Sequence, residues 1–246
     1  MDNIKIIFII TSIALSFSGN AQVPFISSGK IVFERKVNLS KEREYRPLLN
    51  RIGDKLPKYH STQHILYFSE GKTLYEKEKG VEEKDPYYGN DENANDVIYL
   101  DFRKGRVVKK QALFEETIFL SDSIRSIQWE MVNETREIAG FECHKATTVI
   151  LDSIFVVAFY TDQITVNGGP LSYNNLPGMI LGLVIPRMNL TIFATKVELS
   201  EINPEIFKVP KSKQDVDYKE FTKILLEASR KMREPERSRY VINSLL

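Results

Sequence analysis

Alternation of apolar and polar residues is the feature that most limits what this chain can fold into. Between residues 31 and 39, apolar side chains fall on one face, and Glu34, Lys36 and Asn38 fall on the other. This period of two is typical of a strand with one buried side. Further apolar-rich runs cover residues 64–68, 73–75, 96–102, 106–114, 127–132, 141–150, 154–161, 179–185 and 188–199. Turn signals such as Glu70-Gly71 separate them, so we expect an antiparallel sheet rather than a parallel α/β fold.

Only the C-terminal part changes period. From Tyr218 to Met232, apolar residues recur at helical spacing with Lys and Glu between them, and Glu234-Pro235 ends the pattern. The expected fold is mainly β, a β-rich α+β protein. It has a curved antiparallel sheet or unclosed barrel, analogous to the lipoprotein carriers, covered by a C-terminal amphipathic helix. The expected division is a signal peptide over residues 1–21, a β domain over 22–214, and a helix with tail over 215–246.

The N-terminus has the pattern of a secretory signal. Lys5 precedes an apolar run from Ile6 to Phe17, and small residues follow up to Ala21, which predicts cleavage after Ala21. The apolar run is too short and too interrupted for a membrane span of about 20 residues. No later segment is apolar enough to span, and Gln22 stands where a lipoprotein would need Cys. We therefore expect an exported protein that is periplasmic or associated with the outer membrane.

Charge and cysteine content exclude several classes. The chain has 34 Lys plus Arg against 33 Asp plus Glu, a net charge of +1, so no field favours nucleic acid or an anionic membrane. Cys143 is the only cysteine, and an intramolecular disulfide is excluded. It shares a predicted strand face with Phe141 and Thr147, which favours a buried, inert thiol.

Metal and cofactor motifs are incomplete. His60 and His64 are spaced as in a zinc protease, yet the Glu that should follow the first His is Ser61. Cys143 and His144 are adjacent on a strand and point to opposite faces. The acidic and amide residues Asp91, Asn93 and Asn95 begin like a calcium loop, but Asp96 replaces its glycine and Phe102 its closing glutamate. We predict no metal and no cofactor.

Catalytic motifs are also missing from the sequence. It contains no Gly-x-Ser-x-Gly elbow, phosphate loop or dinucleotide fingerprint. The 33 acids leave room for a pair of catalytic carboxylates. The most distinctive segment runs from Tyr160 to Leu183, with Asn167-Gly168-Gly169-Pro170 and Asn174-Asn175-Leu176-Pro177-Gly178. We interpret it as a loop anchored in the core by Leu176 and residues 179–183, in preference to a ligand site.

Motifs in this region resemble one known family. Residues 176–181, Leu-Pro-Gly-Met-Ile-Leu, are similar to the signature of the GLPGLI family of exported Bacteroidetes proteins. Other parts of that pattern follow in order over about residues 127–199: Trp129, Ile138-x-Gly140-x-x-Cys143-x-Lys145-Ala146-Thr147, Ala158-Phe159-Tyr160-Thr161 and Gly169-Pro170. Departures are Phe159 for Trp, Thr165 for Pro, Asn175 for Gly, Met179 for Leu and Gly182 for an acid.

The resemblance implies location more than chemistry, since that family has no established activity and is associated with outer-membrane transport systems. It draws attention to Gly140, Cys143, Lys145, Tyr160, Gly169, Pro170, Leu176, Pro177 and Gly178, which we interpret as structural rather than ligand-binding. The expected function is a non-catalytic binding or accessory module of the cell envelope. Its expected partner is an apolar ligand or an outer-membrane protein.

Two alternatives remain. One is an envelope hydrolase acting on peptides or glycans, which requires two carboxylates that line one cleft. The other is a structural component of a surface complex, with the charged segment from Glu76 to Asp96 as its contact.

Overall fold

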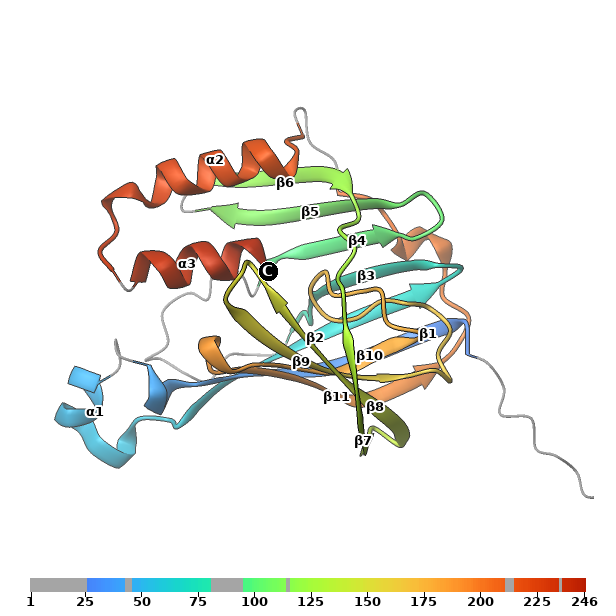
Figure 1. Ribbon diagram of the computed structural model, residues 1–246, viewed down its shortest axis with the longest axis horizontal. Coiled ribbons are helices and arrows are strands. Elements are labelled where there is room, and N and C mark those ends of the chain that lie inside the picture. Colours follow the sequence, from blue (N-terminus) through green and yellow to red (C-terminus); the bar gives the residue numbers. More distant parts are fainter. Residues whose placement is uncertain (1–25, 43–45, 81–94, 114–115, 211–214, 235) are drawn as a thin grey trace, which may run out of the picture.

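The computed structural model describes residues 26–42, 46–80, 95–113, 116–210, 215–234 and 236–246. An antiparallel sheet of 11 strands in the order β6-β5-β4-β3-β2-β1-β11-β10-β9-β8-β7 dominates it (Figure 1). Its two edge strands, β6 and β7, do not pair with each other, so the sheet stays open. The expected mainly β fold with an unclosed antiparallel sheet is confirmed. The predicted signal peptide lies outside the described residues.

The strands follow one another mostly through tight turns. They are β1 (Ser28–Asn38), β2 (Tyr59–Ser69), β3 (Lys72–Lys77), β4 (Val97–Asp101), β5 (Arg106–Leu113), β6 (Glu116–Ser123), β7 (Glu130–Ile138), β8 (Phe141–Ile150), β9 (Ile154–Thr161), β10 (Met179–Ile185) and β11 (Leu190–Leu199).

The chain begins in the middle of the sheet. β1 pairs with β2 on one side and with β11 on the other, both antiparallel. From β1 the chain moves outward to the edge strand β6, and from the other edge, β7, it returns to the centre. The alternation predicted for residues 31–39 is the alternation of β1, in which Ile31 and Phe33 are fully buried.

The C-terminal part forms two helices where the sequence predicts one. α2 (Tyr218–Ala228) begins at the predicted residue, and the Asp217 carboxylate caps it by accepting a hydrogen bond from the Glu220 backbone N–H. It ends four residues early, a 3-10 turn follows (Ser229–Lys231), and α3 (Glu236–Leu245) completes the chain. The two helices lie next to each other near β5 and β6 (Figure 1).

Polar contacts hold these helices on the sheet. Asp122 of β6 accepts a hydrogen bond of 3.0 Å from the backbone N–H of Tyr218, which holds the pKa of that carboxyl below its usual value. Lys109 of β5 forms a buried ion pair with Asp96 at 3.3 Å and also donates to the Ser244 carbonyl in α3. The Asp96 carboxylate therefore stabilises the fold through its ion pair with Lys109. Asp96 is the residue that replaces the glycine in the comparison with a calcium-binding loop.

Other element boundaries differ from the predictions. β2 begins at Tyr59 rather than at His64. The buried side chains at its start, His60 and Thr62, are polar, so the apolar alternation used for the prediction does not extend that far. β6 was not predicted, since it lies at an edge and buries only Leu120. The charged stretch from Lys41 to Ser61 is predicted to be a loop or a short helix, and it contains the short helix α1 (Arg46–Ile52). Remaining single 3-10 turns are Leu39–Lys41, Gly53–Lys55, Pro186–Met188 and Pro204–Ile206.

The interior between the bent sheet and the helices is packed with apolar side chains. One large buried cluster extends from β1 and β2 through β8 to β11 and includes Phe221 and Leu225 of α2. Among the described residues, no helix combines the length and the apolar character needed to cross a bilayer. Burial of this apolar core and the hydrogen bonds between neighbouring strands stabilise the fold.

Two glycines of the predicted motif allow a direct test of this packing. Gly178 has φ +142°, and a Cβ there would lie 2.0 Å from the Thr161 carbonyl oxygen. Gly140 has φ +85° in the β7–β8 turn, with nothing within 4 Å of an added Cβ. Gly140→Ala should cost about 1–2 kcal/mol from backbone strain alone. Gly178→Ala should cost more than about 3 kcal/mol in urea unfolding; equal costs would contradict the packing described here.

Candidate functional site

Two adjacent asparagines, Asn174 and Asn175, connect the loop between β9 and β10 to residues 125–129. The Asn174 side chain donates to the Arg125 carbonyl at 3.1 Å, and the Asn175 side chain donates to the Ile127 carbonyl at 2.9 Å. In the opposite direction, the Trp129 indole N–H donates to the Asn174 carbonyl at 2.8 Å. We call this arrangement of Asn174, Asn175 and residues 125–129 the asparagine clamp. It fixes the segment that enters β7 against the long loop between β9 and β10.

One side of the clamp opens on a hollow that we call the carboxylate cleft. It consists of two depressions, of about 510 Å³ and 330 Å³, on either side of the β2–β3 turn, and Glu70 lines both. Phe102, Arg103, Asn167 and the clamp asparagines line the larger one. The smaller one is lined by Glu201 and Phe207, together with Ser69 and Lys72. Two carboxylates, Glu70 and Glu201, thus line one cleft, which is the condition set for the hydrolase alternative.

Turn geometry positions Glu70. It takes a left-handed conformation, φ +51°, and is followed by Gly71 at φ +77°. The Gly71 carbonyl accepts a 2.9 Å hydrogen bond from the Phe102 backbone N–H, which joins this turn to the β4–β5 turn. Arg103 then reaches the Glu70 carboxylate at 3.8 Å, with both side chains 67% exposed.

Such an exposed ion pair contributes less than about 1 kcal/mol. Both groups of the pair are therefore available to a substrate. A carboxylate can accept a proton from water, and a guanidinium can bind a developing oxyanion. The cleft combines these groups with amide side chains and with aromatic walls.

A third hollow lies on the other side of the clamp. It is an open groove of about 590 Å³, which we call the tryptophan groove. Residues 125–130 supply one wall, including Trp129, and the β8–β9 hairpin supplies the other, including Phe155. The sequence alone does not indicate a ligand site on this surface.

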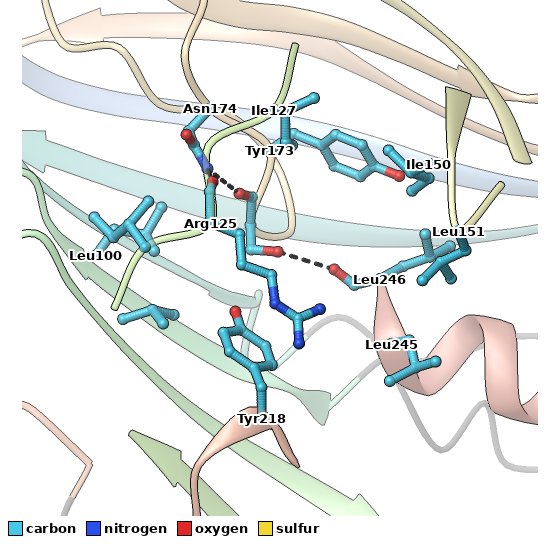
Figure 2. A pocket seen from close by; sticks show the side chains of 13 residues that line it. Leu100, Arg125, Ile127, Ile150, Leu151, Tyr173, Asn174, Tyr218, Leu245 and Leu246 are labelled. Carbon is cyan, nitrogen blue, oxygen red and sulfur yellow. Dashed lines mark hydrogen bonds between the residues drawn. The ribbon is translucent and has the colours of Figure 1, made fainter. Parts of the chain in front are cut away.

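The fourth hollow is an apolar cavity beneath the helices (Figure 2). Its volume is about 90 Å³, against roughly 300–1,000 Å³ for typical small-molecule pockets. The Arg125 guanidinium stacks 3.4 Å from the ring centroid of Tyr218 at its margin, and Ser172 donates to the Leu246 carbonyl at 3.0 Å. This cavity is therefore too small for a typical small-molecule ligand. The cavity does not test whether the protein binds an apolar ligand or an outer-membrane protein, so both partners stay predictions.

The residues emphasised by the motif lie elsewhere. None of Gly140, Cys143, Lys145, Tyr160, Gly169, Pro170, Leu176, Pro177 and Gly178 lines any of these four hollows. Lys145 pairs with Glu134 at 2.5 Å on the strand surface, and the Tyr160 hydroxyl contacts the Met131 sulfur at 3.6 Å. Leu176 is in the core, and a methyl group added to Gly169 would come within 2.6 Å of Ile180. Their contacts define the loop path and the β8–β9–β10 packing.

The residues considered above as metal ligands do not come together in a site either. His60 and His64 lie on the buried face of β2, where the His64 ring stacks on Tyr75 at 5.1 Å. His144 packs against Tyr160 and Cys143 points to the opposite face. Asp91 and Asn93 lie outside the described residues. Within the described part of the chain, no three His, Cys, Asp or Glu side chains are grouped so as to hold a metal ion.

The family of this chain follows from comparison with known proteins. Residues 92–222, more than half of the chain, match the family model described as "N-glycanase peptide, N-terminal domain". The chain belongs to this family. The prediction of GLPGLI membership, which was based on the Leu-Pro-Gly motif, is therefore wrong. The prediction of a non-catalytic binding or accessory module of the envelope is wrong as well.

Two solved structures of PNGF-II, in space groups P21 and C2, share the fold. Their TM-scores are 0.56 and 0.55 at 17% sequence identity, over 82% of this chain. The match covers 34% and 33% of the PNGF-II chains, so this chain spans about one third of their length. A search of curated proteins finds no match.

The buried thiol gives a test of the β8 packing. Cys143 is fully buried, and burial raises the pKa of its thiol to about 12. The folded protein should therefore resist iodoacetamide at about pH 8, because only the thiolate reacts. The same cysteine should be alkylated after unfolding in urea, as followed by mass spectrometry. Rapid labelling of the folded chain would show that β8 does not pack as described.

Proposed function

We propose that the protein is an N-glycanase-like hydrolase, which cleaves glycans from glycoproteins in the envelope or outside the cell. The carboxylate cleft is the observation that carries this proposal, because it brings two acids, an arginine, amides and aromatic rings together on one open surface. Membership of the N-glycanase N-terminal domain family supports a substrate of this class.

The chemistry required is hydrolysis of the bond between a glycan and an asparagine side chain. Glu70 accepts a proton from a water molecule, whose oxygen adds to the amide carbon. The Arg103 guanidinium binds the oxygen that gains negative charge at that carbon. As the carbon–nitrogen bond breaks, Glu201 supplies a proton to the departing glycosylamine. A carboxyl group remains on the protein substrate.

The openness of the cleft suits a macromolecular substrate. Glu70 and Glu201 are both exposed in the structure, and the two depressions that they line are open to solvent. A glycosylated loop of another protein reaches such a surface without unfolding this domain. A deep pocket would instead favour a small free ligand.

The predicted export agrees with this substrate. N-linked glycans occur on surface loops of secreted proteins, so the enzyme and its substrate would meet outside the cytoplasm. Cleavage after Ala21 and a periplasmic or outer-membrane location are part of the same proposal.

Glycan release tests the function. The purified full chain is incubated with a denatured N-glycosylated protein, and released oligosaccharide and the conversion of asparagine to aspartate are measured by mass spectrometry. Glu70→Gln and Glu201→Gln should each lower the rate by about 100-fold or more, because each removes a proton-transfer group.

Glu205→Gln is the matched control. Glu205 follows Glu201 closely, is exposed, pairs with Lys208 at 3.5 Å and lines neither depression of the cleft. Its rate should equal that of the wild type. Absence of any release by the wild-type chain overturns the function, and full activity in both cleft variants overturns the site.

A further inference from the structure

The tryptophan groove lies next to the carboxylate cleft and is not used by the hydrolysis described above. We infer that it is an oligosaccharide-binding groove, which holds the neutral sugar residues of the glycan while the linkage to protein lies in the cleft. This inference rests on the proposed function, and it assigns the outer sugar residues of the substrate to the tryptophan groove.

Trp129 forms a rigid aromatic wall of the groove. Its indole N–H is already used in the 2.8 Å hydrogen bond to the Asn174 carbonyl, and its ring packs against Tyr173 at a centroid distance of 6.3 Å. The side chain is therefore fixed before any ligand arrives, and what it offers the groove is ring surface. Sugar rings present C–H groups that pack on such a surface, as other apolar groups do on aromatic rings.

The opposite wall exposes large apolar side chains that the fold does not bury. Val149, Leu151 and Phe155 are 59%, 43% and 46% exposed, and all three line the groove. Apolar side chains gathered along one exposed groove are a feature of ligand-binding and protein-binding surfaces.

The hairpin turn supports the same conclusion. Leu151 and Asp152 both have positive φ, at +46° and +58°, a turn conformation in which glycine, asparagine or aspartate is usual. A leucine in this conformation costs about 1–2 kcal/mol. Part of its side chain closes the apolar cavity beneath the helices, and the exposed part faces the groove, where a ligand could contact it.

Polar groups around these walls select a neutral, hydroxyl-rich ligand. Ser126, Gln128 and Thr147 offer neutral donors and acceptors, while Arg125 and Glu130 have opposite charges that balance. A balanced rim gives no attraction to phosphates or to an anionic surface. Alternating hydrogen-bonding groups and apolar walls match a sugar chain, which has hydroxyl edges and C–H faces.

The asparagine clamp places this groove beside the cleft. Asn174 and Asn175 line the larger depression of the cleft, and the segment they hold, residues 125–129, lines the tryptophan groove. A glycan that crosses the clamp therefore contacts both hollows. Its protein-linked sugar would lie on the Glu70 side and its outer sugars on the Trp129 side.

Tryptophan fluorescence provides a direct test, because Trp129 is the only tryptophan of the chain. The full chain is titrated with a free oligomannose N-glycan, and the emission should change in a saturable way. Phe155→Ala keeps the reporter and removes an exposed ring, so it should weaken apparent affinity about tenfold, or roughly 1.4 kcal/mol. Leu199→Ala is the matched control, since Leu199 is 55% exposed on β11 and lies outside the groove.

The outcomes separate this inference from the proposed function. No emission change with the oligosaccharide, or equal affinity in Phe155→Ala and the wild type, overturns the groove even if glycan release is observed. A response to phosphatidylcholine vesicles but not to the sugar also overturns it and assigns the surface to lipid. Saturable sugar binding that Phe155→Ala weakens, in a chain that releases no glycan, supports the groove and rejects only the hydrolase.

Discussion

The pairing of β1 with β11 is the contact on which the rest of the structure depends. All other strand neighbours follow each other directly in the sequence, most of them through hairpins, whereas residues 29–37 must find residues 190–199 at the far end of the sheet-forming chain. Closing such a long loop costs chain entropy, which the fully buried side chains of Ile31 and Phe33 offset by removing apolar surface from water. This pairing joins the β1–β6 half to the β7–β11 half and thereby brings the β2–β3 turn close to the β9–β10 loop.

The candidate site follows from that junction. Glu70 comes from the first half of the chain, while the clamp asparagines come from the second, and both line the same depression. The loop between β9 and β10 is long for an antiparallel sheet, yet its path is fixed by a buried leucine, by Gly178 and by the amide hydrogen bonds of Asn174 and Asn175. Rigid loops on a sheet are suited to hold a substrate, because little further ordering is needed when it binds.

Much of the sheet could be predicted from the sequence, because a strand that is buried on one face alternates apolar and polar residues. The prediction was wrong where that signal is weak. His60 and Thr62 are polar residues on a buried face, and β6 is an edge strand with a single buried side chain, so neither shows clear apolar alternation. α3 packs apolar side chains against the core, but Tyr240, Val241 and Ile242 are consecutive in the sequence, so they show no clear repeat at helical spacing.

The site was harder to predict than the fold. The Leu-Pro-Gly motif reflects local demands, a leucine in the core and a glycine against the Thr161 carbonyl, and such demands do not identify a family. Strands β3 to β11 separate Glu70 from Glu201 in the sequence, and the two residues line one depression only in the folded chain. A structure of the Glu70→Gln full chain with a bound N-glycopeptide tests the account most directly. We expect the peptide-linked sugar in the carboxylate cleft and the outer sugars against Trp129; a glycopeptide bound on another face, away from the asparagine clamp, would contradict the account.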